Sequence, residues 1–165
     1  MQRPRLGIAP KRLAAGGGSA GGQVAAAAGI LTPLDEEGED LSVSCRPDAL
    51  VLFNPVFDNG PGGYGHDRVK SRWREFSPKH NIHSGAPPTI VFLGTEDSAL
   101  PVASAEEYGR LMKEVGCRCD VHTYEGQPHG FFNYGDGSNK YYFETVRAAD
   151  RFLASLGLLQ GEPTI

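Results

Sequence analysis

A serine flanked by glycines stands near the start of this 165-residue chain, within the segment GGSAG at residues 17–21. The segment matches the pattern G-x-S-x-G, in which a serine hydroxyl is presented on a sharp turn between a strand and a helix. On such a turn the backbone amide of the following residue points to where an oxyanion forms during acyl transfer. The pattern therefore predicts Ser19 as a nucleophile and Ala20 as an oxyanion donor, with Gly18 next to the substrate.

A nucleophilic serine needs a histidine that takes its proton and a carboxylate that orients the histidine. Asp97 follows the apolar run at residues 89–93, and His129 lies in the loop after the next predicted strand. Ligands of open α/β sheets bind at the carboxyl ends of parallel strands. Because Ser19, Asp97 and His129 all follow predicted strands, we expect them to meet at this edge as a catalytic triad.

Each of the three residues also has a simpler structural interpretation. A serine at the start of a helix caps that helix, and an aspartate after a strand caps the next turn. On this interpretation Ser19 and Asp97 are caps, and His129 is a solvated loop residue. The residue types, their order along the chain and their places at strand ends together favour the triad.

A different function is also compatible with the same glycines. Gly16, Gly18 and Gly21 match the pattern G-x-G-x-x-G of dinucleotide-binding folds. Those folds have a second strand that ends in an acidic residue about 20 positions further on. Here the acidic residues at positions 35–37 follow no predicted strand, so dinucleotide binding is the weaker hypothesis.

The elements that must position these side chains alternate between strands and helices. Apolar runs predict strands and segments of helical periodicity predict helices: strands at residues 12–15, 49–53, 89–93 and 121–124, and helices at residues 20–29, 104–115 and 141–156. Such alternation implies parallel pairing with right-handed crossovers. We therefore predict an α/β fold, with a mostly parallel sheet of about four strands and helices on both faces. Residues 1–165 are expected to form a single domain.

Two further regions are candidates for the substrate site. Residues 58–85 form the longest irregular connection, and long loops in compact domains are often functional. Four aromatic side chains near the predicted histidine either line an acyl or sugar pocket or belong to the core: Phe131, Phe132, Tyr141 and Tyr142. Of these, Phe131 is predicted to contact the substrate.

Composition excludes several classes of function. The net charge is −4, from 16 basic and 20 acidic residues that are interspersed along the chain. This distribution offers no basic stripe for nucleic acid and no polybasic membrane anchor. His80 and His83, with Cys117 and Cys119 nearby in type, do not have the spacing of a zinc site, and we predict no metal.

The cellular location is inferred from cysteines and from the amino-terminal region. Three cysteines are too few for a disulfide framework and indicate free thiols in a reducing compartment. A basic segment at residues 1–12 followed by the weakly apolar run 13–31 imitates a secretory signal, but glycines interrupt that run. It also lacks the roughly 20 predominantly apolar residues of a membrane span. We therefore expect a cytoplasmic protein.

Three segments resemble the α/β hydrolase superfamily, and the resemblance covers nearly the whole chain. AGGGSAGG at residues 15–22, GTED at 94–97 and EGQPHGF at 125–131 are similar to its nucleophile, acid and histidine motifs. They are most similar to the esterase and lipase branch, including acetyl esterases and hormone-sensitive-lipase-like carboxylesterases. The resemblance implies that Ser19 is the nucleophile, His129 the general base and then acid, and Asp97 the orienting carboxylate.

The sequence departs from this superfamily at its start. Related proteins usually have about four further strands before the nucleophile strand, together with a loop that donates other oxyanion amides. Residues 1–10 resemble the tail of the helix that precedes that strand, so the chain looks like the carboxyl-terminal half of a hydrolase. The nucleophile strand is then expected to expose a bare edge, and we predict a homo-oligomer, most simply a dimer.

The expected function is hydrolysis of short-chain, acetyl-type esters through an acyl-enzyme, without a cofactor. Because one oxyanion donor is secured and others are missing, activity is expected to be weak; glycines at residues 60–65 or a partner chain are candidates to replace a donor. A catalytically silent fragment that acts as an oligomeric or binding domain is the alternative. A serine peptidase of the oligopeptidase type shares the triad and is the third hypothesis.

Overall fold

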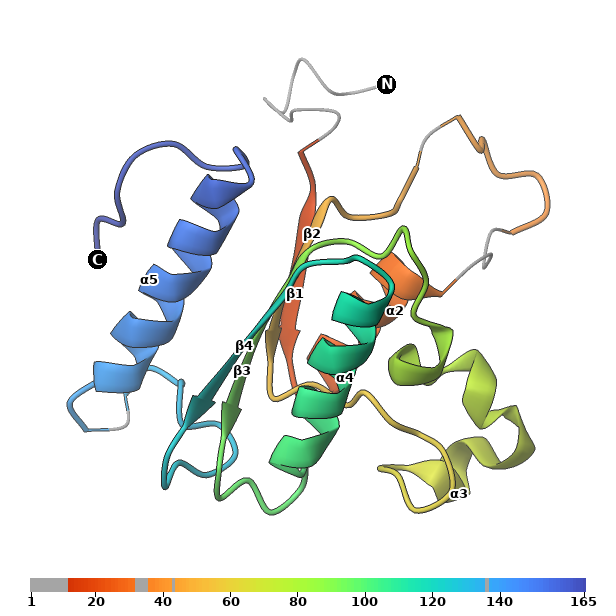
Figure 1. Ribbon diagram of the computed structural model, residues 1–165, viewed down its shortest axis with the longest axis horizontal. Helices are drawn as coiled ribbons and strands as arrows, with labels where there is room; N and C mark the ends of the chain where they lie inside the picture. Colours follow the sequence, from red (N-terminus) through yellow and green to blue (C-terminus); the bar gives the residue numbers. More distant parts are fainter. Residues whose placement is uncertain (1–11, 32–35, 43, 136) are drawn as a thin grey trace.

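A parallel sheet of four strands forms the centre of the computed structural model, which describes residues 12–31, 36–42, 44–135 and 137–165. The strands are β1 (Ala14–Gly18), β2 (Ala49–Phe53), β3 (Thr89–Gly94) and β4 (Cys119–Tyr124), and they lie side by side in this order (Figure 1). All three pairings are parallel. The carboxyl ends of the strands therefore meet at one edge of the sheet, which confirms the predicted fold class.

Helices cover both faces of the sheet. The helices α2 (Ala20–Ile30) and α4 (Val102–Glu114) lie on one face, and α5 (Lys140–Ser155) lies on the other (Figure 1). Each face has its own apolar cluster: one includes Ile30 and Tyr108, and the other includes Ala149 and Phe152. This arrangement confirms the prediction of helices on both faces.

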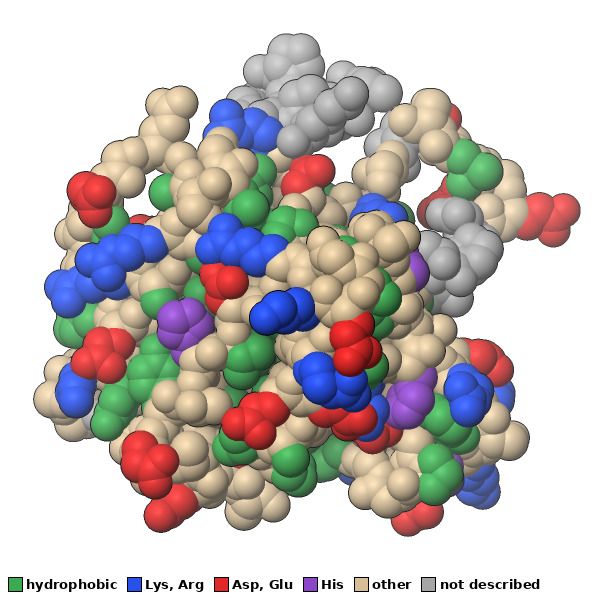
Figure 2. Space-filling model, in the orientation of Figure 1, with side chains coloured by type: hydrophobic (Ala, Val, Ile, Leu, Met, Phe, Trp, Pro, Cys, Tyr) green, Lys and Arg blue, Asp and Glu red, His purple; other side chains and the backbone are tan. Residues whose placement is uncertain are grey.

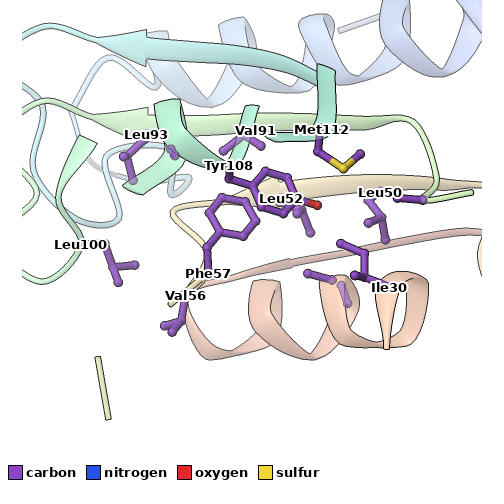
Figure 3. Close-up of a cluster of buried hydrophobic side chains, with 14 residues drawn as sticks. Ile30, Leu50, Leu52, Val56, Phe57, Val91, Leu93, Leu100, Tyr108 and Met112 are labelled. Atoms are coloured by element: carbon purple, nitrogen blue, oxygen red, sulfur yellow. The ribbon is translucent and has the colours of Figure 1, made fainter. Parts of the chain in front are cut away.

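The core under α2 and α4 contains the larger apolar cluster (Figure 3). Phe57 and Tyr108 stack with their ring centroids 3.7 Å apart, and both are at most 1% exposed. Leu50 and Leu52 of β2 pack in the same cluster as Ile30 of α2. Burial of such a side chain contributes about 1.5–3 kcal/mol, so this cluster fixes both helices on the strands that carry the site.

The connection from β2 to β3 is more ordered than the sequence indicated. It contains the short helix α3 (His66–Val69) and the 3₁₀ helices η1 (Lys70–Glu75) and η2 (Pro78–Asn81). Each is only one or two turns long, which explains why no helical periodicity was evident. The connection is anchored by Lys79, whose ammonium lies 2.6 Å from Asp58 and 2.8 Å from Glu107 of α4.

The first strand differs from the prediction at residues 12–15, because it begins at Ala14 and extends through the glycines to Gly18. A Cβ atom on Gly16 would lie 2.8 Å from the carbonyl oxygen of Val51 on β2. Only glycine permits this approach, so the glycines form the end of the strand as well as the turn. Smaller differences occur at α4, which starts at Val102, and at β4, which starts at Cys119.

The outer edge of β1 is free of strand partners in the described part of the chain. Along β1 the exposed residues are Ala14, Gly16 and Gly18, in alternation with half-buried ones. By contrast, every residue of β3 is buried. The helix tail expected at residues 1–10 and the acidic residue Asp35 lie outside the described residues.

Charged side chains of both signs lie on the surface (Figure 2). On the face seen in Figure 2, basic and acidic side chains are interspersed and form no continuous basic stripe. Within the described ranges, no helix combines the length and the apolar character needed to cross a membrane.

Candidate active site

Ser19 lies on a strained turn between β1 and α2. Its backbone has φ 54° and ψ −120°, in the region of positive φ that residues other than glycine rarely adopt. The turn is packed tightly, since a Cβ atom on Gly17 would lie 2.5 Å from the backbone carbon of Gly21. Gly22 is equally restricted, because its Cβ atom would lie 2.9 Å from Pro55. Gly17 and Gly22 therefore meet a steric requirement of this turn.

Two acceptors hold the Ser19 backbone in this conformation. The N–H of Ser19 donates to the carbonyl oxygen of Phe53 at 2.9 Å and to Oδ1 of Asn54 at 3.0 Å. Phe53 is the last residue of β2, which pairs with β1, and Asn54 follows it directly. Ser19 occupies the N-cap position of α2, where its carbonyl oxygen accepts a hydrogen bond from the N–H of Gln23 at 3.1 Å, but its side chain makes no capping hydrogen bond.

Ala20 is the first residue of α2 and is exposed. The first four N–H groups of an α-helix have no partner within the helix, and they carry the positive end of the helix dipole. The first turn of α2 contains no acidic residue that would occupy this region. The amide of Ala20 is thus a suitable donor to an oxyanion next to Ser19.

Asp97 and His129 form a direct contact. Oδ2 of Asp97 lies 2.7 Å from Nδ1 of His129. The other carboxylate oxygen accepts hydrogen bonds from the N–H groups of Ala99 at 2.9 Å and Leu100 at 3.0 Å. The Asp97 side chain is fully buried, and a buried carboxylate needs such partners on both oxygens. Asp97 therefore caps the turn that follows β3 and also binds the histidine.

This contact determines which nitrogen of His129 is free to accept a proton. A proton on Nδ1 is donated to the Asp97 carboxylate, which leaves Nε2 as the basic nitrogen. The His129 side chain is 35% exposed, so it is not enclosed in the core. A general base needs this combination of a fixed tautomer and an accessible second nitrogen.

Close packing holds the histidine loop against the end of β3. A Cβ atom on Gly94 would lie 2.0 Å from the carbonyl oxygen of Gln127, so only glycine fits there. That same oxygen accepts a hydrogen bond from the N–H of Glu96 at 3.0 Å, and Oγ1 of Thr95 accepts one from Gly126 at 2.8 Å. The segment after β3 and the loop after β4 thereby form one unit.

Asn54 is a site residue that the sequence analysis missed. Its Nδ2 atom lies 2.9 Å from Nδ1 of His129, while its Oδ1 atom accepts the Ser19 N–H. In the sequence, Asn54 stands between the apolar run at residues 49–53 and Pro55. Its signal was its position directly after the strand between the nucleophile and acid strands, where a polar side chain faces the same edge.

The three predicted triad residues lie at the same edge of the sheet, but only two of them contact each other directly. Asp97 and His129 are in contact, and Asn54 links His129 to the backbone of Ser19. Among the described residues, no hydrogen bond joins the hydroxyl of Ser19 to His129. Of the glycines at residues 60–65 that were considered as replacement oxyanion donors, Gly62 and Gly63 line a cavity of about 590 Å³ beside the start of α4.

The predicted substrate contacts occupy different surroundings. Gly18 lies at the exposed end of β1, and a Cβ atom there would lie 3.4 Å from the ring of Phe132. Phe131 is 8% exposed and packs in the cluster under α5, with its ring centroid 4.8 Å from that of Tyr124. Phe132, rather than Phe131, is therefore the aromatic ring beside the serine turn, and a substrate contact of Phe131 stays a prediction.

A second serine and histidine pair occurs in the connection between β2 and β3. Oγ of Ser77 lies 2.8 Å from Nδ1 of His80, and a carboxylate oxygen of Asp58 lies 3.8 Å from the same nitrogen. In a catalytic relay the serine and the acid bind opposite nitrogens of the histidine. Because Ser77 is also fully buried, this pair is structural.

Cysteine and metal chemistry have little support in the described residues. Burial, with the nearby charge of Asp120, raises the pKa of the Cys119 thiol to about 12, so this thiol is not reactive at neutral pH. Within the described ranges, no group of three or more histidine, cysteine or carboxylate side chains is arranged to hold a metal ion.

Comparison with known proteins identifies relatives of this chain. Residues 63–158, which include Asp97 and His129, match the Dienelactone hydrolase family. The apo form of esterase 2 from Thermogutta terrifontis is 38% identical, with a TM-score of 0.87 over 95% of this chain and 60% of that chain. A native structure of an esterase from the same organism is 36% identical, with a TM-score of 0.86 over 96% and 60% of the two chains.

A curated relative is the probable isoprenylcysteine alpha-carbonyl methylesterase of Arabidopsis thaliana. It is 28% identical over an aligned length of 148, and the match covers 73% of this chain and 30% of that protein. Across the solved esterases, this chain spans between 58% and 63% of their length. The family match covers more than half of the chain and agrees with the fold and with the paired acid and histidine. The chain belongs to the dienelactone hydrolase family of the α/β hydrolase superfamily.

Proposed function

We propose that this chain carries the machinery of a serine esterase for short-chain acyl esters, with Ser19, His129 and Asp97 as its triad. The observation that carries the proposal is the 2.7 Å contact between Asp97 and His129 at the sheet edge that also bears the strained Ser19 turn. The resemblance to solved esterases at 36–38% identity supports the same assignment.

Acylation begins when the Ser19 hydroxyl attacks the ester carbonyl carbon. Nε2 of His129 takes the hydroxyl proton, and Asp97 stays ionised and stabilises the imidazolium through Nδ1. The carbonyl oxygen becomes an oxyanion, to which the amide of Ala20 donates. Collapse of the tetrahedral intermediate breaks the bond to the alcohol oxygen, which receives the proton from His129 and leaves as the free alcohol.

Deacylation repeats the sequence with water as the nucleophile. His129 takes a proton from water, whose oxygen attacks the acyl carbon of the Ser19 ester. The second tetrahedral intermediate releases the carboxylic acid, and the Ser19 oxygen regains its proton from His129. The products are one alcohol and one acid for each ester and water consumed, and no cofactor takes part in these steps.

The neighbouring structures support a short acyl group. Esterases from Thermogutta terrifontis are solved with propionate and with butyrate bound, and one is phosphorylated by paraoxon. In this chain, the ring of Phe132 beside Gly18 narrows the space next to the serine turn. We therefore propose acetyl and propionyl esters as the preferred substrates.

A second copy of the chain is the proposed partner. The free outer edge of β1, with its exposed glycines, presents backbone groups that another strand can pair with. A two-fold arrangement would pair the two edges and bring the copies together next to the two serine turns. The same exposed edge favours the alternative of a catalytically silent oligomeric domain, because it leaves the surroundings of Ser19 open.

Hydrolysis of p-nitrophenyl acetate tests the proposal and separates it from the alternative. The wild-type chain is expected to release p-nitrophenol, and Ser19→Ala is expected to reduce the rate to the background level. Ser98→Ala is the matched control, because Ser98 is an exposed serine next to Asp97, and this variant should keep the wild-type rate. A rate that is unchanged in Ser19→Ala would overturn the proposal, and a folded wild-type chain without activity would favour the silent domain.

A further inference from the structure

The side chain of Asn54 contacts both the nucleophile turn and the predicted general base. It follows β2, which lies between β1 and β3, and its own N–H donates to the carbonyl oxygen of Phe92 on β3 at 2.7 Å. Asn54 is 1% exposed and has φ 34°, within the left-handed region. A buried amide side chain in a strained backbone conformation has contacts that hold it in place.

The hydrogen bond to Ser19 fixes the orientation of this amide. Because the Ser19 N–H is a donor, the Asn54 atom that faces it at 3.0 Å must be the oxygen. The amide nitrogen then faces His129, 2.9 Å from Nδ1. One planar group therefore spans the gap between the serine turn and the histidine ring.

Two neighbours with opposite character meet at Nδ1 of His129. Asp97 is an acceptor at 2.7 Å, whereas the Asn54 amide nitrogen is a donor at 2.9 Å. A protonated Nδ1 donates to Asp97, and an unprotonated Nδ1 accepts from Asn54, so the ring has a partner in either tautomer. A hydrogen bond to an ionised carboxylate is roughly twice as strong as one between neutral groups. Asp97 therefore determines the main tautomer, in which Nδ1 carries the proton and accepts no hydrogen bond from Asn54. In this tautomer the buried Asn54 amide, 2.9 Å from Nδ1, limits the position of the ring by packing beside it.

Position matters here because the two reacting groups come from distant elements. Ser19 follows β1, the first strand in the order of the sheet. His129 lies in the loop after β4, the last strand in that order. We propose that Asn54 is a positioning residue that holds the Ser19 turn and the His129 ring at the separation needed for proton transfer. This inference rests on the proposed function, because it assigns that proton transfer to Ser19 and His129.

Removal of the Asn54 side chain should therefore affect turnover more than substrate binding. Asn54→Gly is the suitable variant, since glycine adopts a positive φ without strain. We expect kcat for p-nitrophenyl acetate to fall by about 10- to 100-fold, because a displacement of about 1 Å can cost 100-fold. KM is expected to change by less than about threefold, since Asn54 is 1% exposed and offers little surface to a substrate.

Asn59 offers a matched control. Like Asn54 it is buried and follows β2, but its amide bonds to Gln23 at 2.6 Å and to the carbonyl oxygen of Tyr64 at 2.9 Å. Asn59→Gly removes a buried amide of the same kind without touching Ser19 or His129. Both glycine variants should lose stability, but only Asn54→Gly should lose kcat. An equal kcat in the two variants, or a threefold or smaller change in Asn54→Gly, would overturn the proposal.

A spectroscopic measurement tests positioning without relying on activity. The Nδ1–H proton signal of His129, identified by its loss in His129→Gln, should be sharp in the wild-type chain and in Asn59→Gly. It should broaden or vanish in Asn54→Gly, because the space left by the buried amide beside Nδ1 gives the ring more freedom and admits water to the Nδ1–H group. A sharp signal in Asn54→Gly would contradict the proposal. If the wild-type chain has no esterase activity, the proposed function fails and this signal alone decides the role of Asn54.

Asn54→Asp provides a second variant if the glycine variant does not fold. Aspartate tolerates positive φ and keeps an acceptor for the Ser19 N–H, but it replaces the donor that faces His129. We expect a fall in kcat of at least threefold with unchanged KM. An unchanged kcat in this variant would count against a role for the Asn54 amide nitrogen.

Discussion

The two halves of the candidate site are supported in different ways. Asp97 and His129 lie beyond β3 and β4, and every residue of β3 is buried. Ser19 lies beyond β1, an edge strand whose alternate residues are exposed. The acid and histidine half is therefore complete within this chain, whereas the nucleophile half depends on contacts from β2 and has an open outer side.

The difference between the two halves indicates which half limits the proposed activity. The acid and histidine half orients a proton acceptor, and its contacts are all present. In the proposed mechanism the nucleophile half must also stabilise an oxyanion, for which the amide of Ala20 is the proposed donor. Loss of one oxyanion donor typically costs about 100- to 1000-fold in rate. With Ala20 as its proposed donor, the nucleophile half is therefore where we expect turnover to be limited.

The largest effect is expected when the contact between Asp97 and His129 is altered. Asp97→Asn places an amide next to Nδ1 of His129, which favours a proton on Nε2 and removes the base. The rate of p-nitrophenyl acetate hydrolysis should fall by about 10⁴-fold, as expected for a wrong histidine tautomer. The fold should survive, which circular dichroism can verify. A fall of less than tenfold would show that Asp97 does not orient the general base.

The nucleophile half is tested by a matched pair of glycine substitutions. Gly17→Ala places a Cβ atom 2.5 Å from the backbone of Gly21, whereas a Cβ atom on Gly21 meets nothing within 4 Å. Gly17→Ala should destabilise the chain by about 1–3 kcal/mol, as overpacking does, and abolish hydrolysis. Gly21→Ala should stabilise α2 by about 0.5–1 kcal/mol. Urea denaturation measures both, and equal stabilities would contradict the steric account of the turn.

The open edge is tested by a charge on β1. Ala14 is exposed on the edge strand, and Ala14→Lys should prevent another strand from pairing there. We expect the wild-type chain to have the mass of a dimer by multi-angle light scattering at micromolar concentration, and the variant to have that of a monomer. A monomeric wild-type chain would refute the proposed association.

The smallest effect is expected away from both halves, at Asp58. Burial alone raises the pKa of this carboxyl, but hydrogen bonds from Lys79 and the Gly60 N–H outweigh it, so its pKa lies below the ordinary value. A lowered pKa adds stability above the pKa of the unfolded chain, and this stability is lost as the pH falls through the folded value. The free energy of unfolding should therefore decrease on acidification below about pH 4.

Asp58→Asn controls for the other carboxylates. Asparagine keeps the size of the side chain but does not titrate, so its stability should depend less on pH in this range. Urea denaturation of both proteins at neutral and acidic pH measures the difference. Identical pH dependence in the two proteins would show that Asp58 does not contribute.

Sequence analysis predicted the parallel sheet and the helices because their apolar runs are long or strongly periodic. It also placed Asp97 and His129 at the same edge, since both follow strands that pair in parallel. It missed the short helices at residues 66–81, which have too few turns to show periodicity. It also missed the glycines of β1, because their fit against Val51 depends on tertiary packing.

The role of Asn54 lay beyond what the sequence alone could reveal. An asparagine before a proline is typical of a strand end, and nothing local marks it as a partner of residues 35 and 75 positions away. Similarly, Phe131 and Phe132 are adjacent and alike in sequence. The sheet buries one under α5 and places the other against Gly18.

Intact-mass spectrometry after treatment with a fluorophosphonate tests the central claim most directly, because labelling reports an activated serine even when turnover is slow. We predict a single adduct on the wild-type chain, located at Ser19 by peptide mapping and absent from Ser19→Ala. The same adduct should form on Ser98→Ala. No adduct on the folded wild-type chain, or an equal adduct on Ser19→Ala, would contradict the claim that Asp97 and His129 activate Ser19.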